Sequence, residues 1–295
     1  MDRYMRTFVS VAENQSFTRA ADLLHLTQSA VSREIETLER EYGAKLLDRT
    51  NKFVRLTRAG EILYFHAKTI VSEYERARTL IHDLTHEPVG RLSIGSSYSF
   101  GEYMLPHIIA EFKHRYPLVT PKITIMNSKR IRMQVVQRQA DLGIIEGTVH
   151  EKDMEVRPFA TDELVLIVPP DHRFSGVDEI EIGEFESDTW ILREPGSGTR
   201  DSTDQTFLAL GFTPASVMEF GSTQIIKESV RAGLGVAVVS KFAIQTDLRF
   251  GLLRALRIKG HPIHRDFFCA TNASHFRTKA LDLFIDYLCQ WRYPQ

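Results

Sequence analysis

The chain has 295 residues, which exceeds one typical domain, so two or three compact units are expected. It is 43% hydrophobic and 25% charged, as ordinary globular proteins are, and its net charge of −1 excludes attraction to nucleic acid by bulk charge. Because there is no run of about 18 apolar residues and no leader-like start, we expect a cytoplasmic protein without a membrane partner.

No motif in the chain predicts catalysis, a cofactor or a metal site. Cys269 and Cys289 lie in apolar stretches without CxxC spacing, so they are expected to be buried free thiols. Gly233-x-Gly235-x-Ala237 follows a helical pattern and precedes a strand, which is the reverse of the order in a dinucleotide-binding turn. The histidines are scattered, and no nucleophile elbow or phosphate-binding loop occurs. We therefore do not expect an enzyme.

Three short helical patterns occupy the first 42 residues. Apolar spacing predicts a first helix up to about Glu13, and Ser16 can cap a second one through its hydroxyl. The inner face of that second helix carries Ala20 and Ala21, which permit close approach by a neighbour. Thr27 is expected to cap the third helix.

The third helix has one apolar and one polar face. Its apolar residues are spaced 4, 3 and 4 apart and share a face: Val31, Ile35, Leu38 and Tyr42. Ser29 and Arg33 point away from that face, and Ser32 lies at its border. A major groove accepts a helix whose N-terminal residues reach base edges, where Gln and Arg can make bidentate contacts. The alternative is a solvated helix of an all-helical protein.

A basic segment follows the third helix. Residues 45–58 contain five basic side chains against one acid, and 51–57 read as a turn and a short alternating strand. Val54 and Leu56 lie on one side of that strand. Cations on such a segment would contact DNA phosphates. These contacts position the N-terminal helices on the DNA but do not distinguish one base sequence from another.

The residues in this order resemble the LysR-type transcriptional regulators. The resemblance rests on three stretches: Ser16-Phe17-Thr18-x-Ala20-Ala21, Thr27-Gln28-Ser29-Ala30-Val31-Ser32-Arg33 and Arg55-Leu56-Thr57-x-Ala59-Gly60. Ser29 stands where the family usually has Pro, and Leu47 where it usually has Phe. Ser keeps the capping chemistry but loses the fixed φ of Pro.

The resemblance implies a winged helix-turn-helix in residues 1–58 that binds double-stranded promoter DNA. Transferred position by position, Gln28, Ser29, Ser32 and Arg33 should face the DNA bases. In the same way, Arg49, Lys52 and Arg55 should contact phosphates.

A long helix is expected from about Arg58 to Thr85, with Thr57 as its cap. Its apolar residues form a heptad seam, and the charged residues lie between them: Leu63, Ala67, Ile70, Tyr74, Ala77, Ile81 and Leu84. A single amphipathic helix packed on a domain is the alternative. At about 40 Å, however, it is too long for a small head to cover. We therefore predict that residues 59–87 form a linker helix that pairs with a second copy of the chain.

From Arg91 onward the pattern alternates between strand and helix. Apolar runs predict buried strands at 92–94, 123–126, 142–145, 164–168, 190–192 and 236–239. Helical patterns lie between them at 101–115, 129–139, 200–210 and 223–232. This alternation predicts α/β subdomains with parallel-type sheets, in which ligands bind at the carboxyl ends of strands.

Hydroxyl-rich segments stand at four predicted helix starts. They are Gly95–Gly101, Asn127-Ser128, Arg193–Arg200 and Gly221–Thr223. Each offers hydroxyls and free backbone N–H groups, which suit an anion. One such segment is weak evidence because Ser and Thr are ordinary helix caps, but four at equivalent places favour one shared cleft.

The resemblance to LysR-type regulators extends through this region, at Leu105-Pro106, 140–145 and 230–237. It implies a two-lobed effector domain of periplasmic-binding-protein type, with residues 88–162 plus 267–295 as lobe I and 163–266 as lobe II. The effector would bind between the lobes. The candidate pocket residues are Ser97, Ser99, Phe100, Asn127, Ser128, Ser197, Gly198 and Thr199. The loop at 193–200 looks like that of family members that sense small anions.

The sequence thus predicts a multidomain α+β/α/β protein: a sequence-specific DNA-binding transcriptional regulator controlled by a small anionic effector. It is expected to form a homodimer that assembles further into a tetramer, with RNA polymerase as a candidate partner. The alternatives are a solute-binding or transport component, and an enzyme built on the same lobes. The effector, the target genes, the direction of regulation and the choice between dimer and tetramer stay open.

Overall fold

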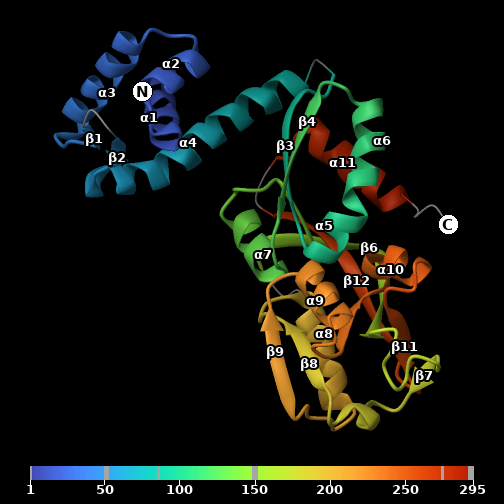
Figure 1. Cartoon of the computed structure of the whole chain (residues 1–295). Helices are drawn as coiled ribbons and strands as arrows, with labels where there is room; N and C mark the ends of the chain where they lie inside the picture. Colours follow the sequence, from blue (N-terminus) through green and yellow to red (C-terminus); the bar gives the residue numbers. More distant parts are fainter. Residues whose placement is uncertain (1, 50–52, 85–86, 148–151, 274–275, 292–295) are drawn as a thin grey trace. The chain divides into compact units, whose positions relative to one another are not determined.

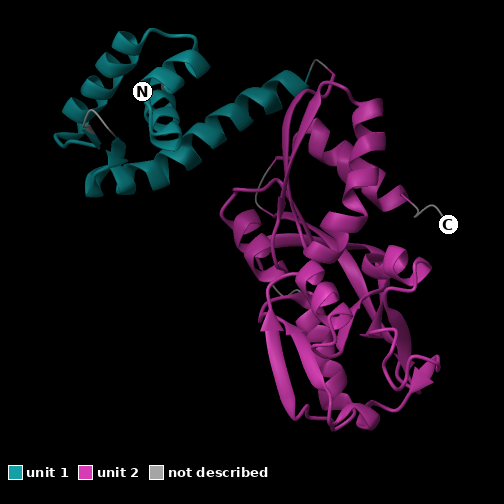
Figure 2. Cartoon of the chain, viewed as in Figure 1, with its two compact units in different colours: residues 1–86 teal, residues 87–295 magenta. Residues whose placement is uncertain are grey.

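The computed structural model describes residues 2–49, 53–84, 87–147, 152–273 and 276–291. It divides into two compact units, Met1–His86 and Glu87–Gln295, which are described separately here (Figure 2). The long helix belongs to the first unit, together with the N-terminal head.

The first unit is a three-helix head, a hairpin and the long helix (Figure 1). Its elements are α1 (Asp2–Asn14), α2 (Phe17–Leu24), α3 (Gln28–Tyr42), β1 (Leu47–Arg49), β2 (Val54–Leu56) and α4 (Arg58–Asp83). The three expected caps are confirmed: the hydroxyls of Ser16, Thr27 and Thr57 each accept a backbone N–H of the following first turn, at 3.2, 3.2 and 3.0 Å. None of the helices in the described part of the chain is long and apolar enough to cross a membrane.

The head is held together by one apolar cluster to which all four helices contribute. Phe8, Val31 and Ile35 are fully buried in it, as periodicity predicts. Burying each such side chain contributes about 1.5–3 kcal/mol. Tyr42 does not join them, because at the last turn of α3 it is 48% exposed. The cluster is completed by the start of α4.

Glu39 anchors the hairpin to α3. Its buried carboxylate accepts the backbone N–H groups of Leu46 at 3.0 Å and Leu47 at 3.4 Å, and Lys45 Nζ lies 2.6 Å from it. Burial opposes the charge of Glu39, but these contacts outweigh it and lower the pKa of Glu39. Nearby, a Cβ on Gly60 would lie 2.0 Å from the Leu46 carbonyl oxygen, so only glycine lets α4 begin this close to the hairpin.

The second unit is built on a mixed sheet with the strand order β4-β3-β5-β12-β6-β11-β7, and β10 also pairs with β6. The strands are β3 (Gly90–Ser96), β4 (Val119–Ile125), β5 (Leu142–Glu146), β6 (Met154–Val168), β7 (Glu179–Ile180), β10 (Ala237–Ser240), β11 (Arg254–Ile258) and β12 (Ile263–Asn272). β3 pairs in parallel with β4 and β5, as predicted. β12 is antiparallel to both β5 and β6, so the sheet is mixed and the parallel type that was predicted holds only for part of it.

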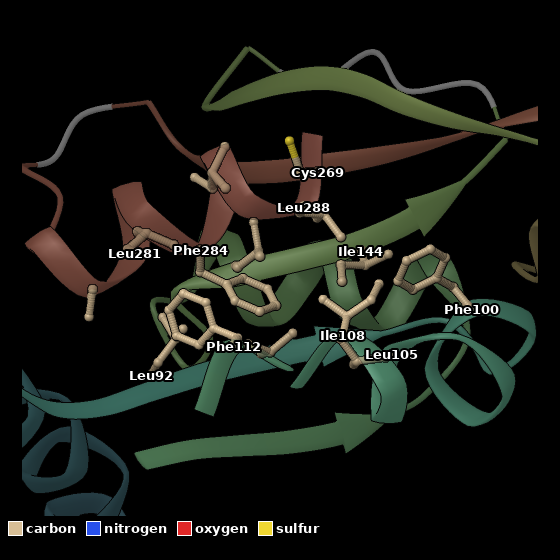
Figure 3. Close-up of a cluster of buried hydrophobic side chains, with 14 of the residues drawn as sticks. Leu92, Phe100, Leu105, Ile108, Phe112, Ile144, Cys269, Leu281, Phe284 and Leu288 are labelled. Carbon is tan, nitrogen blue, oxygen red and sulfur yellow. The ribbon is translucent and has the colours of Figure 1, made fainter. Parts of the chain in front are cut away.

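Lobe I is the part of this sheet around β3, β4 and β5, covered on both faces. α6 (Leu105–Arg115) and α11 (Lys279–Gln290) pack on one face, where Phe112 and Phe284 meet edge to face at 4.9 Å (Figures 1 and 3). α7 (Ser128–Val136) covers the other face. The helix predicted over 101–115 is broken, because α5 (Tyr98–Tyr103) ends before Pro106, which lies in the first turn of α6.

Lobe II is built around the second half of β6. Leu164, Leu166 and Val168 face one apolar cluster while the alternate residues Val165 and Ile167 face another, so this stretch is apolar throughout. The remaining elements are η1 (Ile182–Phe185), β8 (Thr189–Arg193), α8 (Gly198–Ala209), β9 (Ser216–Phe220), α9 (Thr223–Arg231), η2 (Lys241–Ile244) and α10 (Gln245–Arg249). β6 and β12 pair along residues 154–164 and 263–272, and so run through both lobes.

We predict that Glu39→Gln lowers the free energy of unfolding of the head by about 1–3 kcal/mol at pH 7, because two buried N–H groups lose a charged acceptor. The folded-state pKa lies below that of the unfolded chain. The contribution of Glu39 is therefore present above the ordinary glutamate pKa of about 4.3 and is lost as pH falls through the lowered value.

Urea unfolding of the full chain at several pH values, followed by circular dichroism, measures this difference. Glu41→Gln is the matched control, since Glu41 is an exposed residue of the same helix. An equal loss of stability in both variants, or a loss that grows toward acid pH, would contradict the role given to Glu39.

Candidate DNA-binding and effector-binding sites

The outward face of α3 carries the residues that were expected to meet DNA. Gln28, Ser29 and Arg33 are exposed, and Ser32 is half-buried. Gln28 Nε2 lies 3.4 Å from Ser32 Oγ, and the hydroxyls of Ser29 and Thr27 lie 3.1 Å apart. Within the described part of the chain, the guanidinium of Arg33 has no hydrogen bond or ion pair. Its five donors are therefore available to a ligand.

The hairpin presents one described cation beside α3. Arg55 is exposed, and its guanidinium lies 4.6 Å from the centre of the Phe53 ring. Arg49 ends β1, but its side chain is not among the described ones, and Lys52 lies outside the described residues altogether. The phosphate contacts expected for these two residues therefore stay predictions.

The heptad seam on α4 is shorter than the spacing predicts. Leu63 is 7% exposed and Ala67 is fully buried, because both pack into the core of the head itself. They are core residues of the head, so their side chains are not available to pair with a second chain. The remaining positions of the seam are exposed: Ile70, Tyr74, Ala77, Ile81 and Leu84. Of these, Tyr74 lies under the Arg6 guanidinium of α1, at 5.5 Å.

Between the lobes, a buried arginine of β12 joins the starts of two helices. Arg265 Nη2 donates to Ser99 Oγ of α5, and Nη1 donates to Thr199 Oγ1 of α8, both at 2.9 Å. Ser99 belongs to lobe I and Thr199 to lobe II, and both are almost completely buried. Two of the predicted pocket residues are thus brought together by a side chain that was not predicted.

Two carboxylates pair with this guanidinium. Asp162 Oδ2 accepts from Arg265 Nε at 2.9 Å and from Nη2 at 2.6 Å, and Glu146 Oε1 lies 3.0 Å from Nη1. Burial opposes the charge of Arg265, but the two carboxylates outweigh it and raise the pKa of Arg265. Burial, with the nearby charge of Asp162, raises the pKa of Glu146. We call Arg265, Asp162, Glu146, Ser99 and Thr199 the interlobe arginine network.

Glu146 links this network to the N-cap of α5 and to one further helix start, that of α7. Its carboxylate accepts the hydroxyl of Ser97 at 3.0 Å, and its backbone N–H donates to Ser128 Oγ at 3.3 Å. A Cβ on Gly198 would lie 2.2 Å from Glu146 Cγ, so glycine is required where α8 meets β5. Ser97 and Ser128 are 1% exposed and already bonded inside the protein. They hold the network in place.

A second group, which we call the Arg193 network, lies at the carboxyl end of β8. Arg193 binds Glu194 through Nε at 2.8 Å and Nη2 at 3.0 Å, and its guanidinium lies 4.7 Å from the centre of the Tyr98 ring of lobe I. Asn127 Nδ2 donates to Glu194 Oε1 at 3.0 Å, which is another contact between the lobes. Arg193 Nη1 also lies 3.4 Å from Thr223 Oγ1, at the start of α9. All four hydroxyl-rich helix starts therefore meet at one interlobe site.

One predicted pocket residue lies in the core of lobe I, and another is buried at the start of α8. Phe100 is fully buried in the lobe I core (Figure 3). Its ring lies edge to face with those of Phe159 and Phe267, so it is a core residue rather than a pocket residue. Ser197 is 1% exposed, and its hydroxyl has no hydrogen-bond partner among the described residues.

Sequence reasoning missed Arg265, Asp162, Glu146 and Arg193 as site residues. A signal was present for Arg265: it alternates with Ile263 and Phe267, so a charged side chain occupies the inward-facing side of a strand. Arg193 and Glu146 likewise end apolar runs. A charge at such a place is costly unless it is paired, which marks it as part of a polar site.

Comparisons with known proteins agree with this architecture. Residues 3–61 match the family described as bacterial regulatory helix-turn-helix protein, lysR family, and residues 85–292 match the LysR substrate binding domain. The chain is 34% identical over 284 residues to the HTH-type transcriptional regulator CysL of Bacillus subtilis, covering 96% of this chain and 95% of that protein.

Two solved structures extend the comparison. The regulatory domain of Synechocystis PCC6803 CcmR, in complex with 2-PG, is 29% identical and has a TM-score of 0.63 over 68% of this chain and 96% of that one. Full-length CbnR complexed with its target DNA has a TM-score of 0.74 and covers 98% of both chains. At 19% identity it shows a shared fold alone. The chain thus belongs to the LysR family of DNA-binding transcriptional regulators, and pairs a helix-turn-helix head with a two-lobed effector-binding domain.

Proposed function

We propose that this regulator responds to a small anionic effector that binds at the interlobe arginine network. The observation that carries the proposal is the pair of 2.9 Å hydrogen bonds by which Arg265 joins Ser99 of lobe I to Thr199 of lobe II. A ligand that accepts hydrogen bonds from these two hydroxyls contacts both lobes at once. It can therefore distinguish between two lobe arrangements, as an effector has to do.

The chemistry of the site favours an anion. Both hydroxyls accept from Arg265, so each keeps its own proton to donate to a ligand. The positive end of the twelve-residue helix α8 begins beside Thr199, and its free N–H groups attract negative charge. Because Asp162 and Glu146 already pair with Arg265, and Glu194 pairs with Arg193, the charge of the effector has to be met largely by these neutral donors.

At the DNA end, we propose that α3 enters the major groove with Gln28, Ser29, Ser32 and Arg33 toward base edges. The exposure of Gln28, Ser29 and Arg33 in the first two turns of α3 supports this placement. Arg55, with Arg49 and Lys52, would bind phosphates on either side. The target is double-stranded promoter DNA.

The exposed part of the α4 seam, from Ile70 to Leu84, is proposed to pair with a second copy in the cytoplasm, and dimers to assemble into tetramers. Four of these residues are large apolar side chains at least 45% exposed, which is unfavourable without a partner: Ile70, Tyr74, Ile81 and Leu84. Effector binding would shift the arrangement of protomers and thereby the DNA bend and contact with RNA polymerase.

Arg33→Ala should weaken binding to a DNA site selected by the full chain from a randomised duplex pool. Loss of a base contact corresponds to about 1–3 kcal/mol, or roughly 5- to 150-fold in Kd. Electrophoretic mobility shift at fixed salt measures it. Arg254→Ala is the control, because Arg254 is an exposed residue of β11. Unchanged affinity of the Arg33 variant would refute the groove placement.

Ile81→Asp should convert the dimer to monomers, because a buried unpaired charge in a helix seam opposes association. Sedimentation equilibrium of the purified chain measures the change. Ser72→Asp is the control, since Ser72 is an exposed residue on the opposite side of the same helix. A dimer that survives Ile81→Asp would place the self-association surface elsewhere.

Thermal-shift screening of metabolite anions should identify an effector whose Kd rises about tenfold or more in Ser99→Ala and in Thr199→Val, since each variant removes one hydrogen bond to a charged ligand. Isothermal titration calorimetry gives the Kd values. Thr213→Val, in the exposed loop after α8, serves as the control. A hit that binds both site variants as tightly as the wild type would contradict the proposed site.

A further inference from the structure

A cavity of about 530 Å³ lies in lobe I, away from the interlobe site. It is formed where α11 and its preceding residues face the adjoining strands β6 and β12, and its lining comprises Glu155, Val156, Arg157, Cys269, Thr271, Arg277 and Ile285. Arg157 stands five residues before Asp162 on β6, which is roughly 17 Å along the strand. The cavity is therefore separate from the interlobe arginine network.

The position of β6 explains why this cavity exists. β6 is the last strand of the lobe I part of the sheet, beyond β12. The apolar cluster beneath α6 and α11 is centred on β3, β5 and β12, and Cys269 lies at its margin (Figure 3). Cys269 and Ile285 thus line the cavity with apolar side chains at the edge of the surface that α11 covers. Such a lining can bind a short hydrocarbon chain.

The polar lining of the cavity is predominantly cationic. Arg157 is exposed and forms no hydrogen bond or ion pair through its guanidinium with any described residue. Arg277 is already engaged, since it pairs with Glu155 and lies 3.8 Å from Asp282. Thr271 is 4% exposed, and no described residue bonds to its hydroxyl. One guanidinium and one hydroxyl are therefore open to a ligand.

The thiol of Cys269 does not supply a nucleophile to this cavity. Burial, with the nearby Cys289, raises the pKa of Cys269 to about 11, so the thiol is almost entirely protonated at neutral pH. The lining therefore favours reversible binding over covalent chemistry, and Cys269 acts as part of the apolar wall.

We propose that this cavity is a second ligand site, which binds a small monocarboxylate with a short aliphatic body. The carboxylate lies on the Arg157 guanidinium and within reach of the Thr271 hydroxyl, while the hydrocarbon part covers Cys269 and Ile285. A guanidinium presents paired N–H donors that match the two oxygens of a carboxylate. The size of the cavity lies in the range of ordinary small-molecule sites.

Hexanoate is the test ligand, with hexanol and hexylamine as matched compounds that lack the negative charge. At about 10 mM, hexanoate should raise the melting temperature of the full chain and hexanol should not. Hexanoate should also slow hydrogen–deuterium exchange of the peptides that contain Arg157 and Cys269, as followed by mass spectrometry of the digested chain. This second measurement locates the ligand at the cavity.

The site is assigned by variants. Arg157→Gln should weaken hexanoate binding about tenfold, and Arg157→Lys should retain part of it. Because Arg157 forms no ion pair with any described residue, its variants should melt like the wild type without ligand. Arg130→Gln, an exposed arginine of α7, should bind normally, and so should the interlobe variant Thr199→Val.

Three results would overturn the proposal. They are the absence of any hexanoate effect at this concentration, equal effects of hexanoate and hexanol, and loss of binding in Thr199→Val but not in Arg157→Gln. The last result would assign the ligand to the interlobe site instead, and would leave the proposed effector site intact.

Discussion

The buried guanidinium of Arg265 is the constraint on which the two-lobed unit depends. Two carboxylates alone would repel each other in an apolar interior, and a lone arginine there would be unfavourable. Together they form a network in which removal of one partner costs about 3–5 kcal/mol, because it strands a buried charge. This requirement fixes where β12, β6 and β5 meet, and hence where the two lobes face each other.

The same constraint explains why the helix starts carry hydroxyls. Ser99 and Thr199 accept hydrogen bonds from Arg265 from opposite lobes, and Ser97 and Ser128 hold Glu146 in place. Neutral hydroxyls can exchange one partner for another at little cost, whereas the charged residues beneath them cannot. The charged groups of the site are therefore fixed by their ion pairs, whereas its hydroxyls can change hydrogen-bond partner. This combination suits a domain that changes conformation when it binds a ligand.

Features determined by neighbours in the chain could be predicted from the sequence, and features determined by distant contacts could not. The caps at Ser16, Thr27 and Thr57 depend on local hydrogen bonds, and each was found where expected. Leu63 follows the heptad spacing but packs against the head, which periodicity cannot distinguish from a partner chain. Phe100 follows a hydroxyl-rich stretch yet enters the core. Arg265 was not predicted as a site residue because its hydrogen-bond partners lie 66 to 166 residues away in the chain.

The most direct test of the central claim is a crystal structure of the full chain with a bound effector. The account predicts that an oxygen of the ligand accepts a hydrogen bond from Ser99 Oγ or Thr199 Oγ1, within about 3.2 Å, while Arg265 stays on Asp162. A ligand seated elsewhere, with both hydroxyls still bonded only to Arg265, would contradict it.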